Sequence, residues 1–257
     1  MVDSTPDPSS LELARRLNVS AALCTIVSSS ALSASQHEVV LDCGAEVAGD
    51  PGNDVMIRVQ DASGNFVRRR YSVRSHDSET NRLTLWIVTS HDGAGSHWAQ
   101  SAKAGDPVDV VGPHGKILLD PDADWHVFIG DLSGLGAFYR MAQSIDPPGR
   151  AVFIVEIDDA GDALTAPFDE GIGVTGIFVD RNDRARNDPS GLLSGLAAFA
   201  FPPDVGHAYL FGEFSVLKVL RAALVDRGLS DEQISLKAFW RVGRVNAEHG
   251  EPDKSES

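Results

Sequence analysis

The order of apolar and polar positions divides the chain into two parts. Up to about residue 119, short runs that are β-branched or that alternate between apolar and polar residues are separated by Gly, Asp or Pro, which is typical of strands. Six closely spaced strands with one short helical insertion predict a small antiparallel β-barrel. The predicted strands are residues 20–30, 36–43, 54–60, 65–74, 83–90 and 107–111, and the helical insertion is residues 97–102.

The second part follows an Asp-rich stretch at residues 120–124. Short, wholly apolar runs now alternate with helical stretches, which predicts an α/β domain with a parallel sheet. Strands are predicted at 125–129, 151–157, 174–179, 208–211 and 236–240, and helices at 137–144, 192–198 and 215–227. The sequence therefore predicts an α+β protein of two domains, a barrel at residues 11–121 and an α/β domain at residues 122–246.

Both ends of the chain are polar. Residues 1–10 and 247–257 have little to bury, so we expect them to be disordered. A short helix is predicted at residues 11–17, with Ser9 or Ser10 as its N-cap. The sequence shows no secretion-signal pattern and no apolar run of membrane-spanning length, so a cytoplasmic location is expected.

Charge and cysteine content limit the classes of partner. The chain has 257 residues and a net charge of -15. A field of that sign repels nucleic-acid backbones and anionic membranes, so neither is expected as a partner. Cys24 and Cys43 lack CxxC spacing and an accompanying His cluster, so no metal site is expected. We expect both cysteines to be unpaired core residues, with a disulfide as the alternative.

The run Arg70-Tyr71-Ser72-Val73-Arg74 closes a predicted strand and offers what a bound flavin requires. A Tyr ring presents a flat amphipathic surface, and a Ser hydroxyl can hydrogen-bond a flavin nitrogen or carbonyl. An Arg guanidinium can hold a phosphate through its planar fork. The alternative is a solvated basic strand end with one half-buried Tyr.

Two glycine-containing segments are candidates for binding phosphates. Residues 93–96, which include Gly95 and Ser96, form a turn before the helical insertion, where backbone N–H groups and the helix dipole suit a pyrophosphate. A flexible surface turn is the alternative. Residues 130–136, which include Gly130, Asp131 and Ser133, are expected as a flexible loop between a strand and a helix, where a nucleotide diphosphate docks in an open α/β sheet.

Charged residues in the second part suggest how a nicotinamide nucleotide binds. Glu156 and Asp158 end a predicted strand, where they can receive ribose hydroxyls and repel a 2′-phosphate. That argument favours NADH over NADPH, unless Glu156 is merely a solvated strand end. Residues 181–186 form a dense Arg patch that is a further candidate for binding anions, although most such patches are solvated surface.

Motifs in a shared order resemble the siderophore-interacting protein family, the FAD-dependent ferric-siderophore reductases of the ferredoxin-reductase superfamily. Residues 70–74 resemble the family element Arg-x-Tyr-Ser/Thr-x-Arg, and residues 90–99 resemble a degraded form of its His-Gly-x-x-Gly-Pro-Ala-Ser-x-Trp-Ala segment. Further similarities lie at residues 105–106, 112–115, 122–125, 130–131, 211–213, 220–221 and 239–243. The resemblance spans about residues 20–245.

The resemblance implies a function. It implies FAD on the barrel and NADH or NADPH as electron donor, with a ferric siderophore as substrate and a monomer or weak dimer as the working form. It assigns His91, in place of the usual His, and Trp98 to the flavin site, while Trp240 either shields the flavin or packs the last strand. No acid–base residue is needed, so no catalytic residue is predicted. The alternatives are a binding protein without turnover on the same scaffold, and a flavin reductase with another acceptor.

Overall fold

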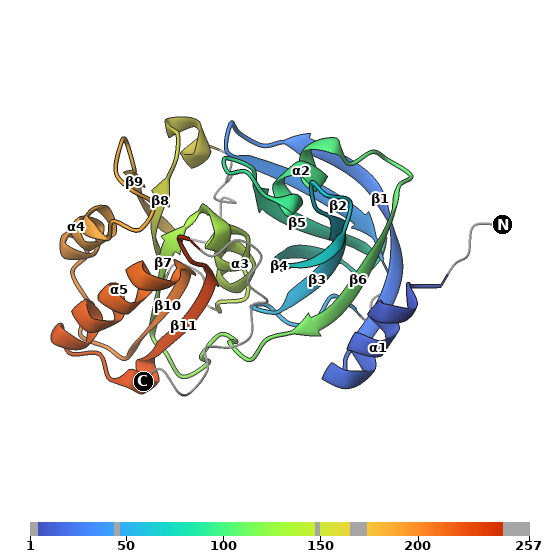
Figure 1. Ribbon diagram of the computed structural model, residues 1–257. Coiled ribbons are helices and arrows are strands. Elements are labelled where there is room, and N and C mark those ends of the chain that lie inside the picture. The colour runs from blue at the N-terminus through green and yellow to red at the C-terminus, as the bar shows by residue number, and fades with distance from the viewer. Residues whose placement is uncertain (1–4, 44–46, 147–149, 165–173, 244–257) are drawn as a thin grey trace.

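The computed structural model describes residues 5–43, 47–146, 150–164 and 174–243. The first part of the chain forms a closed antiparallel barrel, and the second part forms a five-stranded parallel sheet with helices on both faces (Figure 1). The predicted fold class, a barrel followed by an α/β domain, is confirmed. The predicted tail at residues 247–257 lies outside the described residues.

The barrel contains six strands in the order β1-β2-β5-β4-β3-β6. Its interior is filled by the alternating apolar residues that predicted the strands, such as Val55, Ile57 and Val59 on β3. Helix α2 packs against the barrel. The elements are β1 (Ser20–Ala31), β2 (Gln36–Asp42), β3 (Asp54–Gln60), β4 (Phe66–Asp77), β5 (Arg82–Val88), α2 (Ala94–Ser101) and β6 (Pro107–His114).

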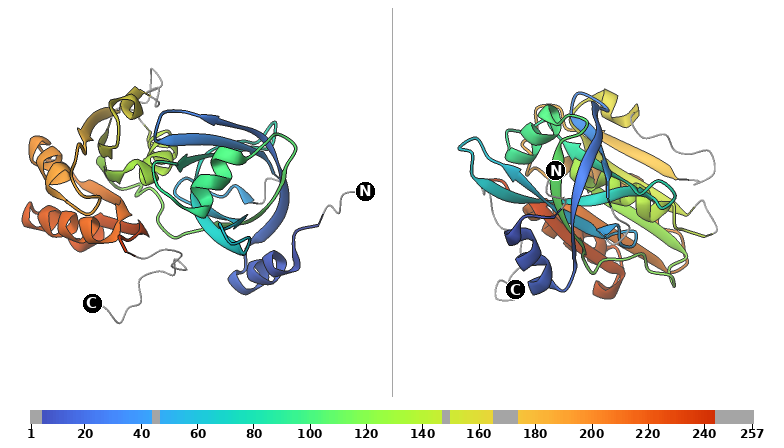
Figure 2. Two further views of the ribbon diagram at one scale, coloured as in Figure 1. Left: turned by 45° about the horizontal axis from the view of Figure 1, so that its top comes forward. Right: turned by 90° about the vertical axis from the view of Figure 1, so that its right-hand side faces the viewer.

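A helix at the N-terminus, α1 (Pro8–Leu17), packs against β1 and β6 on the side away from the α/β domain (Figure 2). It begins earlier than expected, so the prediction of disorder over residues 1–10 is wrong for residues 8–10. The N-cap is Asp7, not Ser9 or Ser10, because the Asp7 carboxylate accepts the Ser9 N–H at 2.9 Å. Ser10 is buried instead and donates to Asp109 on β6 at 3.0 Å.

The second domain has its five parallel strands in the order β11-β10-β7-β8-β9. Helix α3 covers the face toward the barrel and contacts β4 and β5, while α4 and α5 cover the opposite face (Figure 1). The elements are β7 (Trp125–Asp131), α3 (Leu132–Ala142), β8 (Ala151–Ile157), β9 (Thr175–Asp180), α4 (Ser190–Ala198), β10 (Gly206–Glu213), α5 (Phe214–Asp226) and β11 (Ile234–Trp240), with short 3-10 helices at Ala160–Leu164 and Asp231–Gln233.

The segment 130–136 is not the flexible loop that the sequence suggested. Strand β7 runs to Asp131 and α3 begins at the next residue. The Asp131 carboxylate caps the helix by accepting the Ser133 N–H at 2.8 Å, so no loop is needed. Gly130 lies so close to β10 that a side chain there would collide with the Phe211 carbonyl oxygen.

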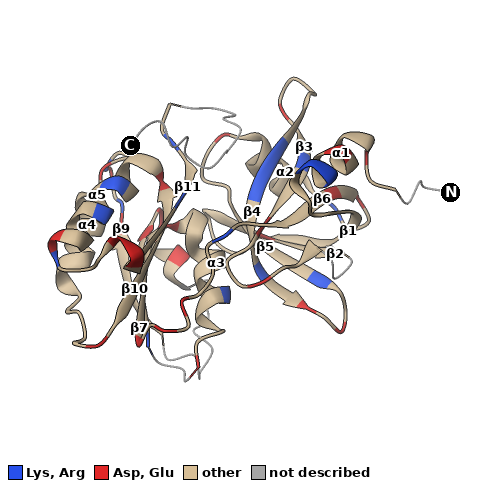
Figure 3. Ribbon diagram, turned by 90° about the horizontal axis from the view of Figure 1, so that it is seen from below, with Lys and Arg blue, Asp and Glu red and all other residues tan. Residues whose placement is uncertain are grey.

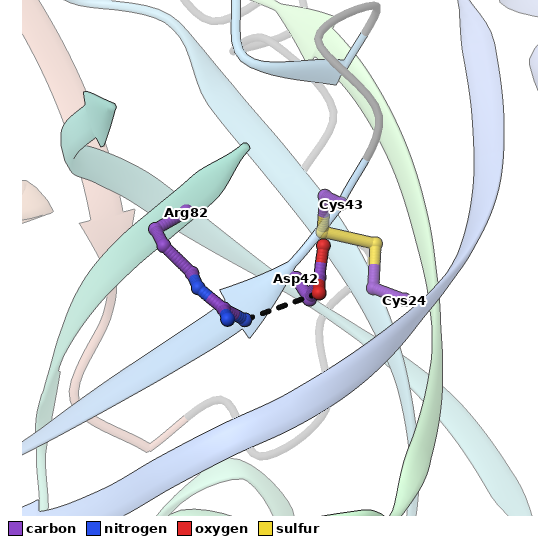
Figure 4. Close-up of a disulfide and its surroundings, with 4 residues drawn as sticks. All are labelled: Cys24, Asp42, Cys43 and Arg82. Carbon is purple, nitrogen blue, oxygen red and sulfur yellow. Dashed lines mark ion pairs between the residues drawn. A yellow bond between two sulfur atoms is a disulfide. The ribbon is translucent and has the colours of Figure 1, made fainter. Parts of the chain in front are cut away.

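The prediction that the two cysteines are unpaired is wrong. Cys24 on β1 and Cys43, which follows β2, form a disulfide with Cα atoms 4.8 Å apart (Figure 4). The antiparallel β1–β2 ladder places them side by side, which residue spacing alone does not reveal. An ion pair of 3.1 Å between Asp42 and Arg82 lies beside the disulfide (Figure 4).

None of the helices in the described part of the chain is long and apolar enough to cross a membrane.

Candidate functional site

A cleft of about 430 Å³ lies where the barrel meets the α/β domain. Strand β4 and the residues before α2 form its barrel wall, and the ends of β7, β8 and β11 form its α/β wall. The lining residues are Arg69, Arg70, Tyr71, Ser72, Trp86, Val88, His91, Asp92, Gly93, Gly95, Asp131, Leu132, Ser133, Asp158, Arg186, Phe239, Trp240, Arg241, Val242 and Gly243.

On the barrel wall, Tyr71 lies against the start of α2. A Cβ added at Gly95 would collide with the Tyr71 hydroxyl, and it would lie 3.5 Å from Cγ of Arg69. Only a glycine therefore allows Tyr71 this position. Burial raises the pKa of Tyr71, so its hydroxyl stays protonated at neutral pH.

The start of α2 has no side-chain cap. Its N-cap residue is Gly93, which makes no side-chain capping hydrogen bond. Gly93 and Gly95 line the cleft, so the positive end of the helix dipole lies at its wall, where the neighbouring Asp92 carboxylate pairs with His97 at 2.8 Å. Arg69 lies on the same wall (Figure 3 shows the basic stretch along β4). This arrangement suits a phosphate.

The even-numbered residues Arg70 and Ser72 of β4 face the buried carboxylate of Asp54. Ser72 donates to Oδ1 of Asp54 at 3.4 Å, and Nε of Arg70 lies 3.7 Å from Oδ2 of the same residue. Lys237 reaches across from β11 and lies 2.6 Å from Oδ1 of Asp54. The two halves of the molecule are thus joined by an ion pair next to the cleft.

On the α/β wall, Asp131 already holds several donors. Besides capping α3, its carboxylate accepts the indole N–H of Trp240 at 2.9 Å and the backbone N–H of Glu213 at 3.1 Å. Burial raises the pKa of Asp131, while these hydrogen bonds oppose the shift. Trp240 is thereby fixed at the edge of the cleft, and the Ser133 N–H is not available to a diphosphate.

The carboxylates at the end of β8 are also occupied. Glu156 accepts from Arg184 at 3.1 Å. Asp158 accepts from Arg181 and, at 3.1 Å, from Arg186. Three guanidinium groups thus face two carboxylates, so the electrostatic argument for NADH over NADPH loses its basis.

The structure brings eight of the predicted site residues to the cleft. They are Arg70, Tyr71, Ser72, His91, Gly95, Asp131, Ser133 and Trp240.

Six predicted site residues lie elsewhere. Arg74 lies further along β4, against α3 and outside the cleft lining: its guanidinium donates to Gln143 at 2.9 Å, and its central carbon lies 4.8 Å from the Trp86 ring centroid and 5.1 Å from that of Tyr139. Val73 and Trp98 belong to the barrel core, and Ser96 is buried with its hydroxyl 3.5 Å from the Val88 carbonyl oxygen. Gly130 packs on β10 and Glu156 on Arg184, as described above.

Sequence reasoning missed Arg69. The motif Arg-x-Tyr places its first arginine two residues before the tyrosine, which is position 69, and strand alternation puts residues 69 and 71 on the same face. That signal was present in the sequence. Asp158 and Arg186 also line the cleft, and their pairing follows from the adjacency of β8 and β9 in the sheet.

A closed antiparallel barrel, then a five-stranded parallel sheet, with an arginine- and aromatic-lined cleft between them, define a two-domain protein of the ferredoxin-reductase-like class. Within that class, residues 123–243 match the siderophore-interacting protein family, and residues 37–117 match the siderophore-interacting FAD-binding domain. The chain belongs to the siderophore-interacting protein family.

Three comparisons agree with this. An uncharacterised protein of Mycobacterium tuberculosis is 30% identical over 188 residues, which cover 69% of this chain and 66% of that protein. The chain thus spans about two thirds of the length of this curated relative. The ferric vibriobactin reductase ViuB of Vibrio cholerae is 32% identical over 97 residues, 37% of this chain and 36% of ViuB. A siderophore utilization protein from T. fusca superposes with a TM-score of 0.78 and 25% identity, over 90% of this chain and 96% of that one.

The residues present fit an FAD. The uncapped start of α2 and Arg69 suit its pyrophosphate, Ser72 offers a hydroxyl, and Tyr71 and Trp240 offer flat surfaces. Because residue 95 is a glycine, no side chain from this position of α2 lies between the helix backbone and Tyr71. The FAD-binding part of the family resemblance and the geometry of the barrel wall therefore agree.

Proposed function

We propose that this protein is an FAD-dependent reductase that uses NADH or NADPH to reduce the iron of a ferric siderophore and release Fe(II). Bound FAD would supply the redox chemistry, which exchanges two electrons with a nicotinamide and single electrons with iron, and the residues of the cleft would hold it. The observation that carries the proposal is the barrel wall, where Tyr71 and Ser72 lie beside Arg69 and the uncapped start of α2. The similarity to ViuB, which is named a ferric vibriobactin reductase, also supports the reduction of ferric iron.

The residues of the chain bind and orient; none has to transfer a proton to the substrate. We assign the pyrophosphate of FAD to Arg69 and the first turn of α2, and the flavin ring to Tyr71 and Ser72. Trp240, fixed by Asp131, covers the opposite side of the cleft and excludes water there. The nicotinamide nucleotide is assigned to the α/β wall, near Asp158 and Arg186.

A spectroscopic titration tests the proposal. The purified protein, loaded with FAD under anaerobic conditions, is expected to lose its flavin absorbance on addition of NADH or NADPH. It is then expected to regain that absorbance with a ferric siderophore, while a ferrous chelator develops colour. Protein that takes up no FAD would sink the proposal.

The same titration separates the two alternatives. FAD that is bound but not bleached by either nicotinamide indicates a binding protein without turnover, which the occupied α/β wall makes a serious competitor. Flavin that is bleached but reoxidised only by oxygen or another oxidant indicates a flavin reductase with a different acceptor.

We also propose a monomer or weak dimer in the cytoplasm. The Cys24–Cys43 disulfide weighs against the second part of that proposal, because disulfides are rare in reducing compartments. Thiol titration of protein prepared from intact cells under alkylating conditions measures whether Cys24 and Cys43 are paired in the cell: two free thiols would agree with the cytoplasm, and none would contradict it.

A further inference from the structure

Asp54 is a fully buried carboxylate at the seam between the two halves of the molecule. It is the first residue of β3, and its side chain is 0% exposed. Lys237 Nζ lies 2.6 Å from its Oδ1, and Arg70 Nε lies 3.7 Å from its Oδ2. Oδ2 is buried and has no hydrogen-bond partner in the described structure.

A carboxylate in this position is expensive to bury unless it serves as a counter-ion. Desolvating an ionised carboxylate is strongly unfavourable, and removing one partner of a buried ion pair is more harmful than the pair is beneficial. Asp54 meets two cations that come from different parts of the fold, Arg70 on β4 and Lys237 on β11. Its position is therefore maintained by both domains.

The contacts place these charges next to the proposed flavin site. Asp54 pairs directly with Ser72 in the β3–β4 ladder, and the Ser72 hydroxyl lies 3.4 Å from Oδ1. Arg70 and Ser72 both line the cleft. One carboxylate and two cations give the cluster a charge of about +1, in a chain whose net charge is -15.

We propose that Asp54 and Lys237 are positioning residues that set the electron affinity of the flavin through Ser72 and Arg70. The inference rests on the proposed function, because it places FAD beside Ser72. Reduction adds negative charge to the flavin, and a fixed positive charge in a poorly solvated wall favours that change. Asp54 partly cancels this charge, and Lys237 supplies part of it.

Two variants are expected to shift the midpoint potential of the bound flavin in opposite directions. Asp54→Asn keeps the shape and the acceptor oxygen but removes the negative charge, so the equilibrium constant for flavin reduction should rise about tenfold, which is about +30 mV for a two-electron couple. Lys237→Met removes a positive charge, so that constant should fall by a similar factor. Lys237→Arg keeps the charge and should restore the wild-type midpoint potential.

The midpoint potential is measured anaerobically by equilibration with a reference dye, with Lys103→Met as a control that removes an exposed charge distant from the cluster. A purely structural role for the cluster would shift both variants in the same direction or shift neither. If Asp54→Asn does not fold, the opposition between Lys237→Met and Lys237→Arg remains decisive.

The outcomes separate the two proposals. Wild-type protein that binds no FAD overturns the proposed function and this inference together. FAD uptake and bleaching by a nicotinamide, with potentials that Lys237→Met and Asp54→Asn leave unchanged, overturn this inference alone.

Discussion

The barrel wall of the cleft and its α/β wall hold their polar groups in different ways. On the barrel wall, α2 begins without a side-chain cap, and Ser72 makes only a long hydrogen bond of 3.4 Å to Asp54. On the α/β wall, Asp131 accepts from Trp240, Glu213 and Ser133, and the β8 carboxylates are paired with arginines.

The difference bears on what each wall can bind. A polar group that already has good partners must give them up to hold a ligand, and the net gain is then small. At the start of α2 and at Ser72 the barrel wall offers donors at little cost, whereas the carboxylates of the α/β wall have to exchange existing contacts. We therefore expect FAD to bind more tightly than a nicotinamide nucleotide.

The largest expected effect concerns the cross-link, which only the barrel has. A disulfide that closes a loop between residues 24 and 43 stabilises the folded state by about 3 kcal/mol. Urea unfolding in the presence of a reductant should therefore show that loss for the wild type. The Cys24→Ala/Cys43→Ala variant should show no effect of the reductant.

Identical unfolding of the oxidised and reduced wild type, with two titratable thiols in denaturant, would mean that the cysteines are unpaired in the protein.

The next effect tests the barrel wall directly. Arg69→Ala should weaken FAD binding about 10- to 100-fold, because a charge-assisted contact to phosphate is lost. The matched control is Arg68→Ala, since Arg68 donates to Ser9 at 2.8 Å, away from the cleft, and should leave the FAD Kd unchanged. Flavin fluorescence quenching measures both constants. Equal effects of the two substitutions would place the phosphate elsewhere.

A smaller effect is expected at the contact between Tyr71 and α2. Gly95→Ala inserts a methyl group into the space of the Tyr71 hydroxyl, so the ring must shift and FAD binding should weaken about tenfold. Adding Tyr71→Phe removes the colliding oxygen and should recover part of the affinity, because Cζ of the ring would still lie 3.0 Å from the new methyl carbon. A double variant that binds FAD no better than Gly95→Ala would show that the collision is not the cause.

A separate effect, graded with pH, belongs to the α/β half. Burial, followed by the neighbouring His207, lowers the pKa of His126 to about 4 from 6.5. The unfolded chain therefore takes up this proton at higher pH than the folded one, and stability should fall as the pH decreases from about 6.5 toward 4. Unfolding free energies measured with urea at several pH values should show a slope against pH that approaches the uptake of one proton on unfolding. His126→Asn should remove it, and an unchanged slope would assign the effect to other groups.

Much of this fold was predictable because its strands follow simple patterns. Alternation gave β3 at the same bounds as predicted, and apolar runs marked β7 and β8. The start of α3 was missed although Asp131 is a local N-cap residue two positions before Ser133, and only the distant donors to Asp131, Glu213 and Trp240, could not be predicted from local sequence. The disulfide also depended on the β1–β2 register, which no local signal contains.

The site was predictable only in part, for a related reason. Residues 70–72 could be identified by their side-chain chemistry, and Arg69 by strand parity. Arg74 and Ser96 were assigned as members of their motifs, but Arg74 packs against Trp86 and donates to Gln143, and Ser96 is buried. The sequence contains both the acidic end of β8 and the basic segment that follows β9, and only the parallel pairing of those strands shows that they neutralise each other.

Isothermal titration of the same apo-protein preparation with FAD and, separately, with NADP⁺ and NAD⁺ tests the contrast between the two walls most directly. We expect the Kd for FAD to be at least about tenfold lower than that for either nicotinamide nucleotide, which corresponds to about 1.4 kcal/mol. A nicotinamide nucleotide that binds the apo-protein as tightly as FAD does, or more tightly, would contradict it.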